Sequence, residues 1–312
     1  MSNSSKDWLS KLGPLIGLIL LIIIVSVMNP SFLSITNIFN VLRQVSISAI
    51  IAFGMTFVIL TGGIDLSVGS TLALTGAVAA SLLAGGVDPF LSMGVALILG
   101  LILGAINGVI ITKGKVAPFI ATLATMTVYR GLTLVYTDGK PISGLGDHLS
   151  FQMFGKGYFF GIPIPVITTI IAFVILYFIL HKTTYGRRVY AVGGNEEAAK
   201  LSGINADRIK IGVYAISGFM AALSALILTS RLNSAQPTAG QAYELDAIAA
   251  VVLGGTSLNG GKGWIFGTLV GALIIGVLNN GMNLIGVSSF WQQVVKGIVI
   301  LLAVLLDRKK SE

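Results

Sequence analysis

The segment Gly255–Gly263 has the residue types of a phosphate-binding loop, but its spacing does not suit nucleotide binding. It reads Gly-Thr-Ser-Leu-Asn-Gly-Gly-Lys-Gly. A phosphate loop needs glycine five residues before the glycine of its Gly-Lys pair, and a Ser or Thr after the lysine to bind Mg²⁺. Those two positions hold Thr256 and Gly263. We therefore expect that this chain binds no ATP and has no cofactor of its own.

Other catalytic patterns are missing too. The sequence contains no cysteine, which excludes disulfides, thiolate metal sites and cysteine nucleophiles. Its two histidines, His148 and His181, lie in a loop and at the end of an apolar stretch. No GxSxG turn, His-Glu-x-x-His sequence or other metal-ligand spacing occurs. The sequence predicts neither an enzyme nor a metal site.

Asp65 is a carboxylate within apolar sequence, directly after the glycine pair Gly62–Gly63. A charged group inside a membrane is costly and marks a functional site by default. Asp65 could equally cap a helix that begins near Leu66, and both interpretations stay open. A second break, Gly254–Gly255, lies near the other end of the chain. Paired glycine breaks are typical of transporters, although chance recurrence among 39 glycines is the alternative.

Five polar residues are candidates for a substrate path. An ion-coupled carrier needs acidic or clustered polar groups at the membrane midplane, and the apolar stretches contain no mid-span carboxylate or histidine. Glu244 and Asp246 stand at the outer end of a stretch, where a cap or a lid contact is expected. The path candidates are Asn107, Asn279, Asn283, Gln236 and Glu244.

Composition places all these residues in an integral membrane protein. The 312 residues are 54% hydrophobic and 10% charged, with a mean hydropathy of +0.92, whereas soluble domains have about 25% charged residues. Glycines at 100, 104 and 108, and at 267 and 271, form small-xxx-small stripes that are predicted to pack helices. The net charge of +8 lies in short loops, as membrane topology signals do. We therefore expect contact with membrane lipid and no nucleic-acid binding.

Ten apolar stretches are predicted to cross the membrane, since each crossing needs roughly 20 residues. If the N-terminus is on the inner side, ten crossings place 14 of the 20 lysines and arginines on that same side. Because basic residues are enriched in cytoplasmic loops, this count predicts that both termini are cytoplasmic. The fold class is all-α, a polytopic membrane protein with 1–312 as a single domain. The stretches are 12–28, 38–60, 70–84, 91–112, 119–136, 164–181, 211–230, 245–256, 264–283 and 291–306.

The charged interval 182–210 is predicted to be cytoplasmic and to contain a short helix. Asn195 can cap its start, Glu196 and Glu197 place negative charge on its first turn, and Gly203 suits the left-handed residue after its last turn. A helix of about eight residues is only marginally stable alone. We therefore expect it to pack against a partner protein.

The sequence Glu197-Ala198-Ala199-x₃-Gly203 resembles the first half of the EAA loop in permease subunits of ATP-binding-cassette importers. The downstream Ile-x-Leu-Pro of that loop is absent. Gly193–Glu196, Leu201–Asn205, Leu60–Ser70 and Glu244–Thr256 are similar to the monosaccharide branch of these permeases. The segments 278–284 and 286–289 resemble those of ribose carriers most, although xylose, galactose and autoinducer permeases share several of the other stretches.

The resemblance implies a homodimeric permease in the bacterial plasma (inner) membrane, with the sugar path between two copies. An external sugar-binding protein would deliver the sugar, and a cytoplasmic ATP-binding-cassette ATPase, which binds ATP and Mg²⁺, would drive its import by alternating access. A stand-alone ion-coupled sugar carrier or facilitator is the alternative. The residues implied in coupling to the ATPase are Asn195, Glu196, Glu197, Ala198, Ala199 and Gly203.

Overall fold

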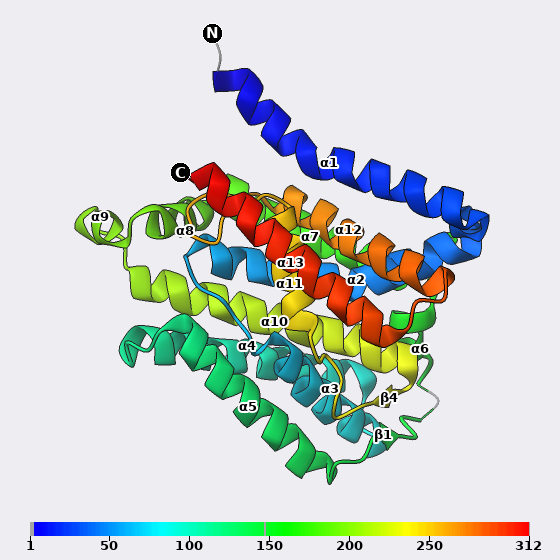
Figure 1. Ribbon diagram of the computed structural model, residues 1–312. Coiled ribbons are helices and arrows are strands. Elements are labelled where there is room, and N and C mark those ends of the chain that lie inside the picture. Colours follow the sequence, from blue (N-terminus) through cyan, green and yellow to red (C-terminus); the bar gives the residue numbers. More distant parts are fainter. Residues whose placement is uncertain (1–2, 147, 312) are drawn as a thin grey trace.

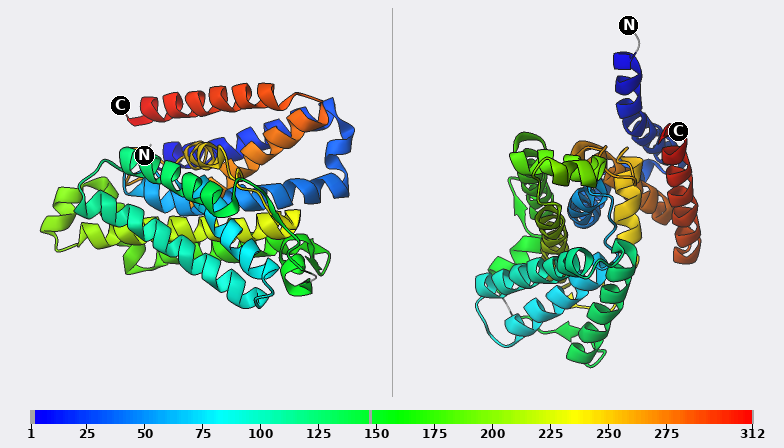
Figure 2. Two further views of the ribbon diagram at one scale, coloured as in Figure 1. Left: turned by 90° about the horizontal axis from the view of Figure 1, so that it is seen from below. Right: turned by 90° about the vertical axis from the view of Figure 1, so that its left-hand side faces the viewer.

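The computed structural model describes residues 3–146 and 148–311, which form a bundle of long helices with only short strands at one end. Figure 1 shows the long helices lying side by side, with the start of α1 and the end of α13 towards the end of the bundle that carries α8 and α9. Figure 2 shows that α1 and α13 lie on the outside of the bundle. The predicted all-α class is confirmed for the described residues.

Each of the ten predicted stretches contains a helix. Six of these helices, α2, α4, α5, α7, α10 and α12, are long and apolar enough to cross a membrane, and shorter apolar stretches lie in α1, α3 and α13. The chain is therefore a polytopic membrane protein. The ten helices are α1 (Asn3–Met28), α2 (Ile35–Leu60), α3 (Val68–Ala84), α4 (Pro89–Lys113), α5 (Pro118–Thr137), α7 (Ile164–Lys182), α10 (Ala206–Leu232), α11 (Tyr243–Leu253), α12 (Ile265–Leu284) and α13 (Ser289–Ser311).

Helix α11 differs from the other nine because its 11 residues are about half of the roughly 20 that a crossing needs. The sequence extends this stretch to residue 256, but the helix ends at Leu253, where Gly254 and then Gly255 follow. The two glycine breaks have the same local structure. Gly62 after α2 and Gly255 after α11 have left-handed backbones, with φ of +77° and +86°. Each break is closed by amide bonds back to the last helical turn, the arrangement for which glycine is favoured.

The core surrounds α2 and α10. Residues 49–60 of α2 are all buried. Helix α10 packs against α4 at backbone distance, since a Cβ at Gly104 would lie 2.1 Å from the carbonyl oxygen of Tyr214. A Cβ at Gly271 on α12 would lie 1.9 Å from the carbonyl oxygen of Ala250 on α11. The prediction that the glycine stripes pack helices is therefore confirmed.

The segment 137–163 between α5 and α7 is structured and attached to α10. It contains α6 (Leu149–Lys156) and the short strands β1 (Ile142–Ser143), β2 (Tyr158–Phe159) and β3 (Ile162–Pro163). The hydroxyl of Ser230 accepts a 2.8 Å hydrogen bond from the amide of Gly155 and donates to the carbonyl of Phe151. Strand β1 pairs with β4 (Ser234–Ala235), which follows α10. The backbone groups of the segment 137–163 therefore find partners on α10 and β4.

Candidate functional site

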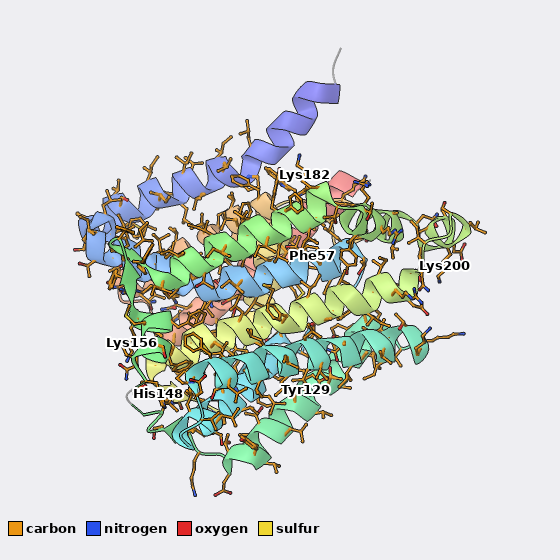
Figure 3. The ribbon with its side chains drawn as sticks, turned by 180° about the vertical axis from the view of Figure 1, so that it is seen from behind. Phe57, Tyr129, His148, Lys156, Lys182 and Lys200 are labelled. Carbon is orange, nitrogen blue, oxygen red and sulfur yellow. The ribbon has the colours of Figure 1, made fainter. Side chains whose placement is uncertain are left out.

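The interval 182–210 forms two short helices at one end of the bundle. Helix α8 (Thr184–Gly194) follows α7 directly and was not expected from the sequence, and α9 (Glu196–Leu201) lies at the tip. Lys182 and Lys200 mark this end in Figure 3, while His148 and Lys156 mark the opposite end. The charged interval 182–210 is therefore a helical projection from one end of the bundle.

Helix α9 has the predicted caps. The side chain of Asn195 accepts a 2.9 Å hydrogen bond from the amide of Ala198. Gly203 has a φ of +80°, and the amides of Gly203 and Ile204 donate to the carbonyls of Lys200 and Ala199. This is the Schellman arrangement that glycine favours after a helix. The helix is shorter than expected, with six residues.

Glu196 attaches α9 to the rest of the chain. Its two carboxylate oxygens pair with Lys200, at 2.8 Å, and with Lys210 at the start of α10, at 2.5 Å. Partial burial raises the pKa of Glu196, but the hydrogen bonds and charges of the two lysines outweigh it, so the pKa lies below its usual value. Glu196 therefore serves this chain's own fold as a charged anchor.

The free surface of α9 consists of fewer residues than the sequence suggested. Ala199 is buried, while Glu197 and Ala198 are exposed. Leu201 is 91% exposed, which makes it the most exposed apolar side chain of the helix. An apolar residue in a charged segment was the signal that could have identified Leu201 as part of a docking surface.

The end of α8 meets both glycine breaks in one junction. A Cβ at Gly193 would lie 1.7 Å from the carbonyl oxygen of Leu60 and 2.7 Å from the amide nitrogen of Gly261. That amide donates to the same Leu60 carbonyl at 2.9 Å. The hydroxyl of Tyr190 on α8 donates to the carbonyl of Gly263 at 2.8 Å, and burial raises the pKa of Tyr190 to about 12. The segment after α11 thus lies between the projection and the end of α2.

Asp65 is buried and joins the first glycine break to α10. One carboxylate oxygen accepts from the amide and hydroxyl of Ser67, at 3.0 and 2.7 Å. The other accepts from the hydroxyl of Ser217 on α10, at 2.8 Å. The capping prediction is wrong in detail, because α3 begins at Val68 and its N-cap residue Ser67 makes no side-chain cap bond. Asp65 instead accepts hydrogen bonds from Ser67, which lies in the break before the helix.

Asn107 on α4 extends this network and does not line an open path. Its amide nitrogen donates to the hydroxyl of Ser67 at 2.8 Å, and its side chain is fully buried. The amide oxygen has no hydrogen-bond partner among the described residues. The structure therefore places this path candidate inside the packing between α3 and α4.

Helices α3 and α11 begin next to each other, inside the depth of the bundle. A Cβ at Gly69 would lie 2.1 Å from the carbonyl oxygen of Gly240 and 2.8 Å from a carboxylate oxygen of Glu244. Glu244 is about 15 Å from Gly255 along α11, at 1.5 Å per residue, which is about half of a 30 Å hydrocarbon core. Glu244 is thus in the first turn of α11 and lies beside the start of α3.

A hollow of about 420 Å³ lies where these two helices begin, beside α5. Its polar lining comes from three different elements. Helix α5 contributes Thr127 and Arg130, α3 contributes Ser70, and the start of α11 contributes Glu244, with Gln241 just before it. Together, these side chains can both donate and accept hydrogen bonds. Of the five path candidates, Glu244 alone is in this lining.

Arg130 is a lining residue that was not among the five path candidates. It lies about 10 Å inside the α5 terminus at 1.5 Å per residue. Its Nη1 atom donates to the carbonyls of Pro237 and Ala239, at 2.6 and 2.8 Å. These bonds hold the segment 233–242, which carries non-helical backbone into the bundle, against α5. Such backbone is tolerated at membrane depth only where protein buries it or where it lines a cavity.

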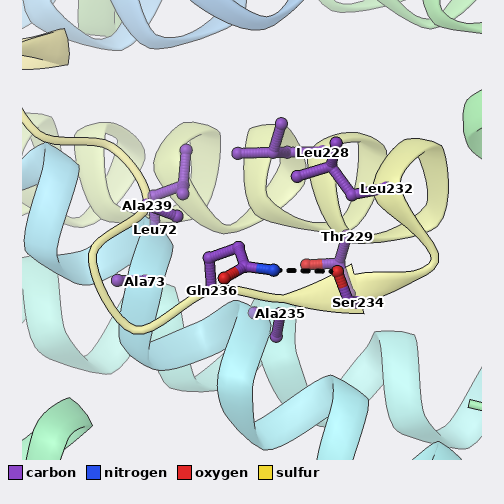
Figure 4. Close-up of a pocket in the computed structure, with 10 residues that line it drawn as sticks. Leu72, Ala73, Leu228, Thr229, Leu232, Ser234, Ala235, Gln236 and Ala239 are labelled. Carbon is purple, nitrogen blue, oxygen red and sulfur yellow. Dashed lines mark hydrogen bonds between the residues drawn. The ribbon is translucent and has the colours of Figure 1, made fainter. Parts of the chain in front are cut away.

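The remaining path candidates are elsewhere. Gln236 lies beside a space of about 10 Å³, too small for a sugar, and its side-chain amide donates to Ser234 at 3.2 Å (Figure 4). Asn279 is buried on α12 with its amide oxygen unpartnered among the described residues. Asn283 is exposed near the end of α12 and accepts from Gln292 at 2.8 Å. The structure does not bring these residues to the hollow.

Asp246, which was expected to form a cap or a lid contact, pairs with another helix. Its carboxylate contacts Lys296 of α13 at 3.0 Å, with the two side chains 12% and 25% exposed. The pair joins α11 to α13, one of the two helices on the outside of the bundle (Figure 2). This pairing could not be predicted from the sequence, because Asp246 and Lys296 are far apart along the chain.

Comparison with known proteins identifies a family. The family model described as branched-chain amino acid transport system / permease component matches residues 37–304. The ribose import permease protein of Bacillus subtilis is 68% identical over 303 residues, covering 97% of this chain and 94% of the relative. The Escherichia coli ribose import permease protein is 56% identical, covering 98% and 96%. The Escherichia coli D-allose transport system permease protein is 42% identical, covering 99% and 95%. No solved structure matches.

Proposed function

The chain belongs to the branched-chain amino acid transport system / permease component family, and we propose that it is the membrane-spanning subunit of an ATP-driven ribose importer. The observation that carries the proposal is the 68% identity to a ribose import permease over 97% of this chain. The identity falls to 42% for a D-allose permease and to 39% for a xylose permease. Ribose is therefore the favoured substrate within the monosaccharides.

The energy source lies in a partner protein. A cytoplasmic ATP-binding-cassette ATPase binds ATP and Mg²⁺ and docks on α9. The exposed Glu197, Ala198 and Leu201 support this docking, because a six-residue helix projecting from the bundle has little packing of its own. Gly203 supports it indirectly by ending the helix. Asn195, Glu196 and Ala199 stabilise α9 itself, through a cap, ion pairs and burial respectively.

Two copies of the chain form the importer, with the sugar path between them. Exposed polar side chains within membrane depth, such as Gln241 and Thr127, support a second copy, because lipid cannot hydrogen-bond with them. Ten membrane elements with both termini and the interval 182–210 in the cytoplasm account for the 14 to 6 distribution of basic residues. The importer lies in the bacterial plasma membrane, where an external binding protein delivers the sugar to the opposite face.

Transport proceeds by alternating access. ATP-driven approach of the ATPases moves α9, and the junction of Gly193 with Leu60 and Gly261 supplies a backbone route from that helix to both glycine breaks. The break at Gly62–Gly63 lies before the start of α3, and the break at Gly254–Gly255 directly follows the end of α11. A movement there changes which side of the membrane reaches the space between the two copies. The permease needs no catalytic residue for this step, since the ATPase supplies the free energy.

Reconstitution tests the proposal. Proteoliposomes with this chain, its ATPase and a ribose-loaded binding protein are expected to take up labelled ribose only when ATP is present on the ATPase side. Glu197→Lys is expected to abolish uptake while membrane insertion stays intact. Asp138→Asn is the control, because Asp138 follows the last residue of α5, at the end of the bundle away from α9 (Figure 1). Unchanged uptake by Glu197→Lys would contradict the docking role.

The alternative is a carrier or facilitator that works alone. Proteoliposomes containing only this chain distinguish the two functions. Uptake of ribose down its gradient, or driven by a proton gradient, without ATPase would overturn the proposal.

A further inference from the structure

We propose that the hollow between α5 and the start of α11 is the monosaccharide-binding site of the permease, with Glu244, Arg130 and Gln241 as its hydrogen-bonding groups. The inference rests on the proposed function and goes further by assigning the residues that hold the sugar in transit. The hollow is bounded by three elements that meet inside the bundle: α5, the beginning of α3 and the segment leading into α11.

The first argument is the polarity of this surface at its depth. Gln241 and Thr127 are exposed and Arg130 is only half-buried, although α5 is a candidate membrane span. Polar and charged groups in a membrane face a water-filled cavity or the interior of the protein. The hollow, which lies about 15 Å along α11 from Gly255, is therefore a stretch of aqueous path of the kind in which transporters bind their substrates.

The second argument is chemical. Each hydroxyl of a sugar both donates and accepts a hydrogen bond. A carboxylate accepts only, a guanidinium donates only, and an amide or hydroxyl does both, so Glu244, Arg130 and Gln241 together match a neutral polyol. Met126 and Leu134 complete the lining and offer an apolar wall to the C–H groups of the sugar ring. The volume of about 420 Å³ lies within the range of small-molecule sites.

The third argument is that the groups are held in place. Two carbonyls accept both N–H groups of Arg130 Nη1. The other donors of the guanidinium have no hydrogen-bond partner in the described part of the chain and are available to a ligand. Glu244 rests against Gly69, where no side chain intervenes. Fixed groups of this kind lower the ordering cost of binding.

Cysteine labelling tests the site, and the chain is a natural background for it because it contains no cysteine. Thr127→Cys and Gln241→Cys are placed one at a time in the complete importer in nanodiscs. Both are expected to react with a water-soluble thiol reagent and to lose this reactivity when the ribose-loaded binding protein and ATP are added. Val128→Cys, on the neighbouring exposed position of α5, is the control and is expected to react only with a membrane-soluble reagent.

Transport by substituted residues provides a second readout. Glu244→Gln and Gln241→Ala are each expected to raise the ribose concentration for half-maximal uptake by roughly tenfold, because each removes or weakens a hydrogen bond to a sugar hydroxyl. Thr168→Val, which removes a helix-bonded hydroxyl on α7, is the control and is expected to transport normally.

The outcomes separate this inference from the proposed function. Normal ribose uptake by wild type together with unreactive cysteines, or with reactive cysteines that sugar does not protect, would overturn the site alone. Normal half-maximal concentrations for both Glu244→Gln and Gln241→Ala would also overturn it. Absence of ATP-driven uptake by wild type would overturn the proposed function instead.

Discussion

A Cβ at Gly193 would lie 1.7 Å from the carbonyl oxygen of Leu60, so the last turn of α8 and the last turn of α2 are in backbone contact. The amide of Gly261 donates to the same carbonyl. One oxygen atom therefore joins the projecting segment to the segment after α11. Any movement of α8 must displace α2 or break this contact.

Gly193→Ala is expected to reduce ATP-driven ribose uptake strongly, because the new methyl group forces α8 away from α2. Overpacking of this kind costs about 1–3 kcal/mol. Gly194→Ala is a matched control, since a Cβ at Gly194 has no atom within 4 Å. Uptake and ATPase activity are measured in the reconstituted importer for both variants. Equal uptake by Gly193→Ala and Gly194→Ala would contradict a role of this contact in coupling.

Gly104→Ala is expected to destabilise the bundle by about 1–3 kcal/mol through overpacking. Its Cβ would lie 2.1 Å from the Tyr214 carbonyl, at the contact between α4 and α10. Gly94→Ala on the same helix meets no atom within 4 Å and serves as the control. The measurement is the midpoint of thermal unfolding in detergent. A midpoint for Gly104→Ala as high as that of the control would show that α4 can move away from α10 at no cost.

Asp65→Leu is expected to destabilise the protein more than Asp65→Asn. The leucine leaves the amide and hydroxyl of Ser67 and the hydroxyl of Ser217 without their acceptor, and each unsatisfied buried group costs about 1–3 kcal/mol. Asparagine keeps one acceptor oxygen and adds a donor that the Ser217 hydroxyl can accept. Unfolding midpoints in detergent compare the two variants. The same midpoint for both would show that these hydrogen bonds do not hold the break.

Glu196→Gln is expected to loosen α9 from α10 at neutral pH, since it removes the charge that Lys200 and Lys210 share. The folded pKa of Glu196 lies below the reference value of 4.5. The carboxylate therefore stabilises the attachment above pH 4.5, and this contribution is lost as the pH falls through the folded pKa.

Hydrogen exchange of the amides in 196–203 measures this attachment in the isolated permease. Exchange in Glu196→Gln is expected to be faster at pH 7, and added salt is expected to speed exchange in wild type by screening the exposed pair with Lys200. Glu197→Gln is the control, because Glu197 is exposed and makes no ion pair in the described structure. Identical exchange in the two variants would exclude the charge as the anchor.

The sequence by itself determined the class of the protein and the position of its helices. Low charge and long apolar stretches require a membrane, and the positions of ten helices follow from hydropathy alone. The caps of α9 were also readable, because Asn195 and Gly203 act on backbone groups only a few residues away. Helix α8 was missed because its residues are mixed in polarity and its packing against α7 and α10 is a tertiary contact.

Only the tertiary structure decided which polar residues lie together. Asn107 and Asn279 looked like path residues because they are polar groups on apolar stretches, but packing buries both. Gln236 was a candidate from a loop, and it lies beside a space too small for a sugar. Arg130 was not a candidate, yet the segment 233–242 places Glu244 beside it in the same hollow. That meeting depends on close backbone contact between Gly69 and Gly240, and no periodicity along a single chain encodes a contact between segments so far apart.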